Sequence, residues 1–269
     1  MELHLSHDEL LVFLTIIGVP TMNGLEDDPL EGLDERVIAE RLNSGEQSLI
    51  NRGLLVIDEN SVTLDDTLVA LVGSSVAPDA TFLLTRIEPD GSNEVHYFNV
   101  TSEITVEHYS PKAGIYRFTY IPDDEALTAR LHTLLEPLSS APEPPAEKIF
   151  HRPLSADAMT RFMQQCQEGA TVEALQILVS AGWSQEAARP LVDAHISRPT
   201  WVGATAWHLR SGAPSSLGPL MIFQGEDRCW LATNMEDSPN EVLFQVTSGE
   251  QCSAALLAMA EPLHSNSRN

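Results

Sequence analysis

The sequence predicts an α+β fold in which an α/β unit is duplicated about a pseudo-twofold axis, with an antiparallel meander and a group of helices in each half. Residues 81–138 have the pattern of a meander closed by a helix. The same landmarks return, in weaker form and in the same order, at residues 200–263. A proline-rich segment at residues 139–148 separates the two copies. We expect the strands to lie in one sheet or two abutting sheets, with helices grouped at both ends.

The meander is predicted from period-two alternation interrupted by short turns. Its strands fall at residues 81–89, 94–100, 104–109 and 115–121, and the first turn contains Pro89-Asp90-Gly91. In the last strand, Tyr116 and Phe118 should face away from Ile115 and Ile121, as expected for an antiparallel hairpin. A helix should begin near Asp123, because a proline precedes it and acids fill its first turn. Its apolar side consists of Leu127, Leu131, Leu134, Leu135 and Leu138.

The segment before the meander predicts helices and a small hairpin. Ser6 and Glu9 have the spacing of a capping box for a helix that ends at Gly18. A second helix is predicted at residues 34–52, a hairpin at residues 54–57 and 61–64, and a third helix at residues 65–73. Helix followed by hairpin is the layout of a winged helix. Glutamates offset the arginines of its second helix, so we interpret the wing as structural rather than DNA-binding.

The second half repeats this order, including a winged-helix-like segment. The stretch that begins with Leu154-Ser155 matches the one that begins with Leu5-Ser6, and helices are predicted at residues 172–181 and 187–196. Strands should enter at Trp201 and continue at residues 220–223, 229–233 and 242–246, before a closing helix at residues 251–263. The predicted division is therefore a first half at 1–138, a linker at 139–152, a diverged second half at 153–263 and a tail at 264–269.

Charge is the dominant feature of the composition. The chain has 39 acidic against 15 basic residues and a formal net charge of −24. Such a charge repels phosphate backbones and anionic lipid surfaces, so we expect neither nucleic acid nor membrane as a partner. No apolar run approaches the roughly 18 residues that a transmembrane helix needs. The acidic N-terminal residues lack the basic region of a signal peptide, and the three cysteines form no CxxC pair. These features predict a cytoplasmic location.

No pattern predicts catalysis, a cofactor or a metal site. Walker loop, GxGxxG, HExxH and GxSxG spacings are all absent. The histidines are scattered, although His96 and His108 could face each other across two strands. The glycine-flanked segment 212–218 is expected to be a turn-rich loop, and the acids at residues 26–28 a solvated loop. Trp201 and Trp207 should share a face of one strand, where core packing explains them more simply than a ligand platform.

The opening sequence MELHLSHDELLVFL and the duplicated architecture resemble the EspG-type proteins associated with type VII (ESX) secretion. The resemblance covers almost the whole chain, from Leu3 to Leu263, and also involves Thr85-Arg86-Ile87 and the hairpin at residues 115–120. It implies a soluble cytosolic chaperone that binds helical PE–PPE pairs. It also implies a contact surface formed by the sheet loop at residues 89–94 and the helices at residues 155–167 and 172–181. The apolar residues of these helices that we expect to bind a partner are Met159, Met163, Val172 and Leu175.

Three functions remain open from the sequence. The first is a non-enzymatic cytosolic binding protein, a chaperone that binds a helical secreted protein by an apolar groove. The second is an enzyme or small-ligand-binding protein with its site at the seam between the two halves. The third is an acidic regulator or nucleic-acid mimic built on the winged-helix-like segments. An exposed apolar patch on the helices after Leu154 would favour the first.

Overall fold

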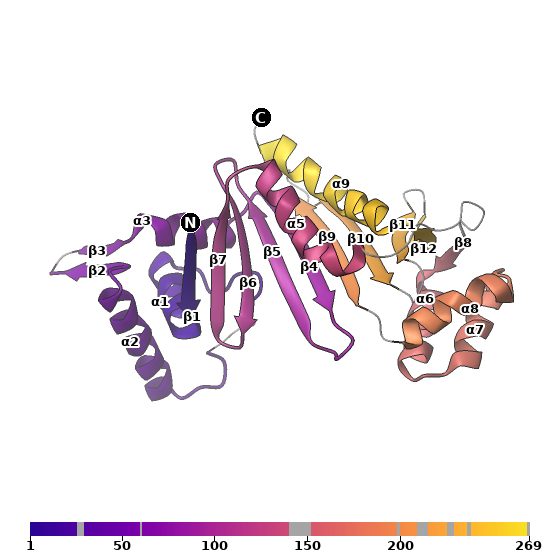
Figure 1. Ribbon diagram of the computed structural model, residues 1–269. Coiled ribbons are helices and arrows are strands. Elements are labelled where there is room, and N and C mark those ends of the chain that lie inside the picture. The colour runs from indigo at the N-terminus through magenta and orange to yellow at the C-terminus, as the bar shows by residue number, and fades with distance from the viewer. Residues whose placement is uncertain are drawn as a thin grey trace.

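The protein, seen in a computed structural model, is built around one antiparallel sheet of ten strands. The structure describes residues 1–25, 30–59, 61–139, 152–197, 200–208, 215–224, 229–235 and 238–267. Within these residues the strand order is β1-β7-β6-β5-β4-β9-β10-β11-β12-β8, and β2 and β3 form a separate hairpin (Figure 1).

The first half contributes one edge of the sheet and a helical group. Its strands are β1 Glu2–Ser6, β2 Leu55–Asp58, β3 Ser61–Leu64, β4 Ala80–Ile87, β5 Asn93–Val100, β6 Thr105–Lys112 and β7 Ile115–Ile121. Its helical segments are α1 His7–Ile17, α2 Glu35–Asn51, α3 Asp66–Leu68, the π-helical η1 Val69–Gly73, α4 Ser74–Val76 and α5 Asp124–Ser139.

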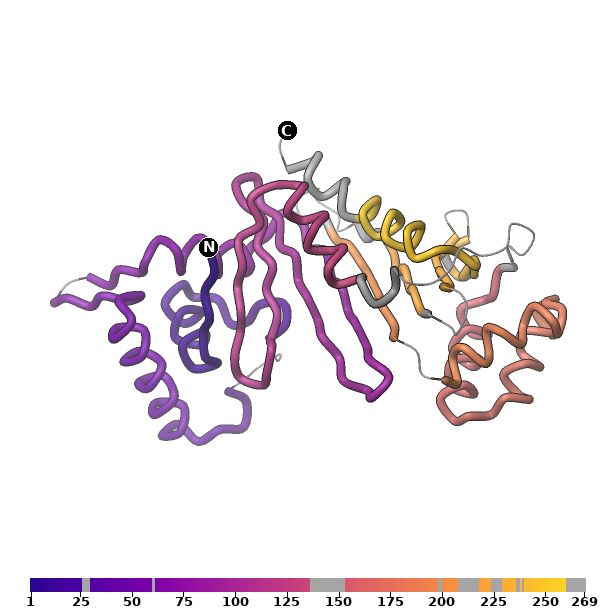
Figure 2. Tube along the Cα trace, in the orientation of Figure 1, coloured from indigo at the N-terminus to yellow at the C-terminus, as the bar shows by residue number. Residues whose placement is uncertain are grey.

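The second half contributes the other edge. Its strands are β8 Arg152–Ser155, β9 Trp201–His208, β10 Ser215–Gln224, β11 Cys229–Met235 and β12 Ser238–Thr247. Its helices are α6 Ala156–Gln167, α7 Thr171–Ser180, α8 Gln185–Ile196 and α9 Gly249–Ser267. Figures 1 and 2 show α1 and α2 at one end of the sheet, α6 to α8 at the other, and α5 and α9 side by side over its middle.

The two halves share one sheet because β4 pairs with β9 along its whole length, from Ala80↔His208 to Ile87↔Trp201. The strand order is also balanced about this pair. Counted inward from the β1 edge, the strand before α1 is followed by the meander in reverse, from β7 to β4. Counted inward from the β8 edge, the strand before α6 is likewise followed by the meander in reverse, from β12 to β9. A pseudo-twofold relation would produce such an order. The duplication itself and its boundaries stay predictions.

The alternation of the strands divides the core between the two faces of the sheet. One face packs against α5 and α9, and Phe82, Phe98 and Ile121 belong to this layer. On the other face, Tyr116 and Phe118 pack against α1 in the first half. Phe223 and Phe244 pack against α6 to α8 in the second half. The opposite orientations predicted for Phe118 and Ile121 are therefore confirmed.

Local signals placed the helix ends well. Ser6 accepts a hydrogen bond from the Glu9 backbone N–H (3.2 Å), and Glu9 Oε2 accepts one from the Ser6 N–H (2.7 Å), which is the expected capping box. Gly18 ends α1 in the left-handed conformation. The predicted helix at residues 65–73 is instead three short segments that continue to Val76, with a π-helical turn in the middle.

Four features of the structure differ from the expectations. The edge strands β1 and β8 were not predicted. β8 contains Pro153, which an edge strand tolerates because one side of it needs no donor. No wing hairpin lies between α7 and α8, where every residue is described, because a short turn joins the two helices directly. Part of the expected loop at 212–218 belongs to β10, and α9 extends through the first residues of the predicted tail. Most of the predicted linker lies outside the described residues.

Candidate partner-binding site

The turn between β4 and β5 forms one side of the candidate site. The Glu88 N–H donates to Ser92 O (2.8 Å) and the Gly91 N–H donates to Glu88 O (2.9 Å), which closes the turn. Gly91 has φ of 84°, a conformation that costs glycine little. Asp90 accepts from the Ser92 N–H (2.8 Å), so the turn is fixed by its own residues. The Pro-Asp-Gly turn predicted from the sequence is present.

The side chain of Glu88 connects this turn to the second half. It forms an ion pair with Arg86 and accepts a hydrogen bond from Thr200 Oγ1 at 3.0 Å. Thr200 immediately precedes β9, the first strand of the second half. The turn is thereby held beside the start of β9.

Helices α6 and α8 form the opposite side. Ser155 caps α6 by accepting from the Ala158 N–H (3.3 Å), and Ser184 caps α8 by accepting from the Ala187 N–H (3.2 Å). Phe162 is fully buried, and His195 is 5% exposed. This burial fixes the rotation of both helices and places Met163 and Cys166 toward the turn.

His195 lies in an aromatic enclosure. Its ring centroid is 4.8 Å from that of Phe162, 4.7 Å from Trp201 and 4.3 Å from Phe223. Nδ1 is 3.3 Å from Leu191 O, a contact in which the ring donates, and Nε2 is 3.2 Å from Met163 Sδ. Burial lowers the pKa of His195 to about 3, so the ring is neutral at physiological pH.

Between these two sides lies a pocket of about 320 Å³. The first half contributes Ile87, Glu88, Pro89 and Gly91, and the second contributes Met163, Cys166, Gln167, His195 and Trp201. The pocket therefore lies at the seam between the halves. Its volume is at the lower end of the range for small-molecule sites, and it suits one or two apolar groups.

The groups that face the pocket are suited to binding rather than to proton transfer. Burial raises the pKa of the Cys166 thiol to about 12, so it is not a nucleophilic thiolate at neutral pH. His195 is held neutral, and both oxygens of Glu88 have partners. The remaining surface comes mainly from Ile87, Met163 and Trp201, and Ile87 is 41% exposed. Such a surface is suited to contact with apolar groups.

The four residues predicted to bind a partner occupy different positions. Met163 lines the pocket. Val172, at the start of α7, is 73% exposed. Met159 and Leu175 are only 7% and 9% exposed and belong to the core beneath α6 and α7. The structure thus brings Met163 to the pocket, and leaves Val172 on the outer surface of the helical group.

A second, more polar groove of about 690 Å³ runs between α6 and α7. Its polar lining includes Arg161, Gln164, Gln165, Glu173 and Gln176. The two helices that the resemblance predicts as a contact surface therefore line this groove together, whereas only the first of them, α6, also borders the apolar pocket.

Of the pocket residues, Pro89, Gly91, Met163, Cys166 and Gln167 fall within the segments predicted as a contact surface, whereas Ile87, Glu88, His195 and Trp201 fall outside them. Trp201 was predicted only as a core residue. Trp201 and Trp207 do lie on the same face of β9, since Val202, Ala204 and Ala206 point to the opposite core. No spacing in the sequence relates Ile87 to Met163 or His195. Only the pairing of β4 with β9 brings them together.

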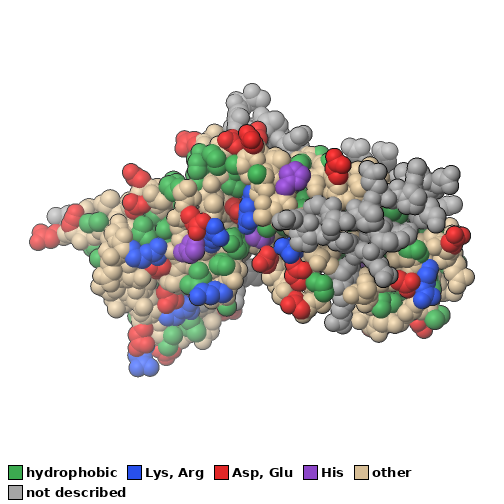
Figure 3. Space-filling model, viewed as in Figure 1, with side chains coloured by type: hydrophobic (Ala, Val, Ile, Leu, Met, Phe, Trp, Pro, Cys, Tyr) green, Lys and Arg blue, Asp and Glu red, His purple; other side chains and the backbone are tan. Residues whose placement is uncertain are grey.

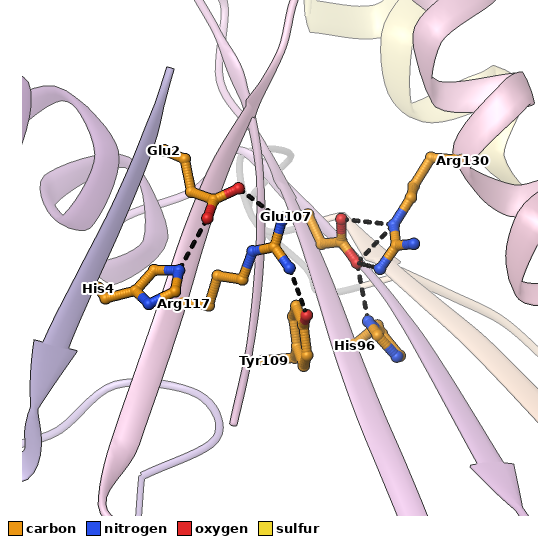
Figure 4. A network of polar contacts seen from close by, with 7 residues as sticks. All are labelled: Glu2, His4, His96, Glu107, Tyr109, Arg117 and Arg130. Carbon is orange, nitrogen blue, oxygen red and sulfur yellow. Dashed lines mark hydrogen bonds and ion pairs between the residues drawn. The ribbon is translucent and has the colours of Figure 1, made fainter. Parts of the chain in front are cut away.

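The other candidate groups do not form a site. His96 pairs with Tyr109 and His108 with Tyr97, so the two histidines lie on opposite faces of the sheet, and the expected pairing was wrong. His96 donates toward Glu107 (2.8 Å), which also binds Arg130 at 2.8 Å (Figure 4). Within the described residues no His, Cys, Asp or Glu cluster could hold a metal ion. The acids at residues 26–28 lie outside the described residues.

The network in Figure 4 crosses four neighbouring strands on the face that α5 covers. Arg117 donates to Tyr109 Oη (2.9 Å) and to Glu2 (2.5 Å). Burial alone would raise the pKa of Glu107, but hydrogen bonds from His96 and Arg130 outweigh it and keep the pKa below its ordinary value. Every strong charge in this network has a partner, which favours a structural role.

The comparisons with known proteins identify the fold. The chain is similar to the chaperone in the structure of the Mycobacterium tuberculosis type VII secretion system chaperone EspG5 in complex with a PE25–PPE41 dimer. The similarity covers 97% of this chain and 96% of that one, with a TM-score of 0.69 and 14% sequence identity. No protein-family pattern and no curated protein matches the sequence. At this identity the comparison establishes that the chain has the EspG fold, as the resemblance predicted. Among the described helices, none has the length and hydropathy needed to span a bilayer.

Proposed function

We propose that this protein is a non-enzymatic cytosolic chaperone that binds a helical segment of a secreted protein at the seam pocket. The observation that carries the proposal is the apolar pocket between the β4–β5 turn and helices α6 and α8. The EspG5 chaperone, which has the same fold, was solved with a protein dimer bound. An amphipathic helix could place one or two apolar side chains in the pocket while its backbone lies along α6.

The acidic surface complements this role. A net charge of −24 keeps the chain soluble at high concentration and repels other copies of itself. The groove between α6 and α7 shares α6 with the pocket, and together with the exposed Val172 it would extend the contact along the helical group. Binding would cover apolar surface on the partner, which is what keeps an aggregation-prone helical protein in solution.

The test is a pull-down from the cytoplasm of the native host with matched surface variants. Ile87→Glu puts a charge at the rim of the pocket, where Ile87 is 41% exposed. Val69→Glu makes the same change at a side chain that is 45% exposed but lies in η1 of the first half. We expect wild type and Val69→Glu to retain a stoichiometric helical protein, and Ile87→Glu to retain less than about a tenth as much.

The retained protein should then be expressed alone and together with this chain. A chaperone should raise its soluble fraction, and Ile87→Glu should not. The proposal fails if Ile87→Glu retains the partner as well as Val69→Glu does, or if the partner is fully soluble alone.

A second candidate function is the binding of a small apolar molecule in the same pocket, which is favoured by its mainly apolar lining. Equilibrium dialysis of the purified chain against a panel of apolar compounds, with Met163→Glu as the variant, separates the two. Saturable binding that Met163→Glu abolishes, together with no protein partner, would support this candidate instead.

A further inference from the structure

The hairpin β2–β3 has an apolar face that continues from the core into solvent. Leu55 pairs with Leu64, and Ile57 pairs with Val62, so all four side chains lie on one face of the hairpin. Leu55 is 1% exposed and Leu64 packs against the first-half core. Ile57 and Val62, one step further out, are 47% and 53% exposed. An isolated two-stranded hairpin gains nothing from exposing this pair.

The outer edges of the hairpin are also free to form hydrogen bonds. In the part of the chain that the structure describes, β2 pairs only with β3 and neither strand joins the large sheet. The hairpin projects from the end of the molecule, away from α6 to α8 (Figure 1). Unpaired backbone N–H and C=O groups along an exposed edge are a template for an additional strand.

The charges around the hairpin are negative. Asp58 ends β2, Glu59 follows it and Asp66 lies just beyond β3, and all three are exposed. The arginine nearest in sequence, Arg52, is occupied by Glu9 Oε1 at 2.8 Å and by His4 O at 2.8 Å. In Figure 3 acidic side chains cover the projecting tip, with apolar side chains behind them. A second copy of this chain would bring like charges together, whereas a cationic segment would be attracted.

We propose that the β2–β3 hairpin binds an extended segment of another protein in which apolar and Lys or Arg side chains alternate. An added strand presents alternate side chains to the two faces of the hairpin. Its apolar side chains would cover Ile57 and Val62. Its basic side chains would lie on the other face, which carries Asp58 and Val56. The hairpin projects from the end of the molecule that carries α1 and α2, whereas the pocket lies between the β4–β5 turn and helices α6 and α8, so this surface is independent of the proposed function.

The test measures binding of a fluorescent peptide of alternating lysine and valine to the full chain by anisotropy. Peptides of alternating lysine and serine, and of glutamate and valine, serve as comparisons. The variant Ile57→Ser/Val62→Ser removes the apolar pair. Its matched control is Ile16→Ser/Ile17→Ser, because these side chains are 39% and 38% exposed at the end of α1. Asp58→Asn/Glu59→Gln removes the charge at the tip.

We expect saturable binding of the lysine–valine peptide, weakened about tenfold or more by Ile57→Ser/Val62→Ser and unchanged by the control pair. Asp58→Asn/Glu59→Gln should weaken binding and reduce its dependence on salt. Equal affinity for the lysine–serine peptide, or no effect of Ile57→Ser/Val62→Ser in a chain that still unfolds cooperatively in urea, would overturn the proposal. So would a concentration-dependent dimer of the free chain that this variant abolishes, because the hairpin would then bind a second copy.

Discussion

Gly45 lies where α2 crosses α1, and replacing it by alanine should destabilise the protein. A Cβ at this position would lie 2.4 Å from Asp8 O and 2.6 Å from Asp8 C. Both atoms belong to the backbone of the other helix, so no side chain can rotate away. The helices would have to separate, and the same crossing holds Glu9, which accepts from Arg52 at 2.8 Å and from Ser48 Oγ at 2.7 Å.

The expected change in the free energy of unfolding for Gly45→Ala is the difference between two opposing contributions. Alanine is favoured over glycine inside a helix by about 1 kcal/mol. Overpacking of a well-packed contact costs about 1–3 kcal/mol, and a backbone contact this short belongs at the upper end of that range. The net loss in the free energy of unfolding is therefore about 2 kcal/mol. It would be larger if the shift also parted Glu9 from Arg52, since a buried charge left without its partner costs about 3–5 kcal/mol.

The assay is urea unfolding followed by far-UV circular dichroism, with Gly73→Ala as the matched control. Gly73 has a helical φ of −58°, and a Cβ there would meet nothing within 4 Å. Gly73→Ala should therefore be neutral or stabilise the chain by up to about 1 kcal/mol. A Gly45→Ala variant as stable as wild type would show that the α1–α2 crossing has room for a Cβ, contrary to the contact described above.

Other changes test the sheet and its buried histidine. Gly24→Ala should lower the free energy of unfolding in urea by about 2 kcal/mol or more, because Gly24 has φ of 80° and its Cβ would lie 2.7 Å from a Tyr97 ring carbon. An unchanged urea midpoint for Gly24→Ala would contradict this expected loss of stability. Burial lowers the pKa of His108 from 6.5 to about 4, so the unfolded chain takes up a proton first as the pH falls. The free energy of unfolding should therefore be nearly constant above pH 6.5 and fall as the pH drops toward 4. The expected loss between pH 7 and pH 5 is about 2 kcal/mol. NMR titration of the ring should give the lowered pKa, and an ordinary value would be inconsistent with its burial. Arg130→Leu should cost on the order of 3 kcal/mol at pH 7 by leaving Glu107 under-compensated, and less at acid pH where Glu107 is protonated. If Arg130→Leu lowered the free energy of unfolding equally at pH 7 and at acid pH, the loss could not come from the charge of Glu107.

The elements predicted best from the sequence are those whose signals are local. The Ser6 and Glu9 capping box and the left-handed Gly18 define α1 within a dozen residues. The Pro-Asp-Gly turn and the alternation of residues 115–121 define the meander in the same way. In each case the residues that determine the conformation are close neighbours in the chain, so their types and spacing are sufficient.

Features that depend on distant partners were missed. The strand β1 is short, and it is recognisable as a strand only through its pairing with β7, for example Leu3 with Phe118. Whether His96 and His108 face each other depends on the pairing register of β5 and β6. A shift of one residue moves a side chain to the other face of the sheet, and no local pattern fixes that shift.

The sequence by itself determined an acidic α+β chain, most of its helices and the absence of the common catalytic motifs, and it predicted two related halves. It also gave enough resemblance to predict the EspG fold. Only the tertiary structure decided which apolar side chains of the second helical group are available. Met159 and Leu175 are buried, Val172 is exposed and Met163 meets Ile87 and His195 in a pocket. The physical reason is that helical periodicity marks an apolar face without telling which residues a neighbouring element covers. The pocket exists because β4 pairs with β9 and brings the turn of one half against the helices of the other.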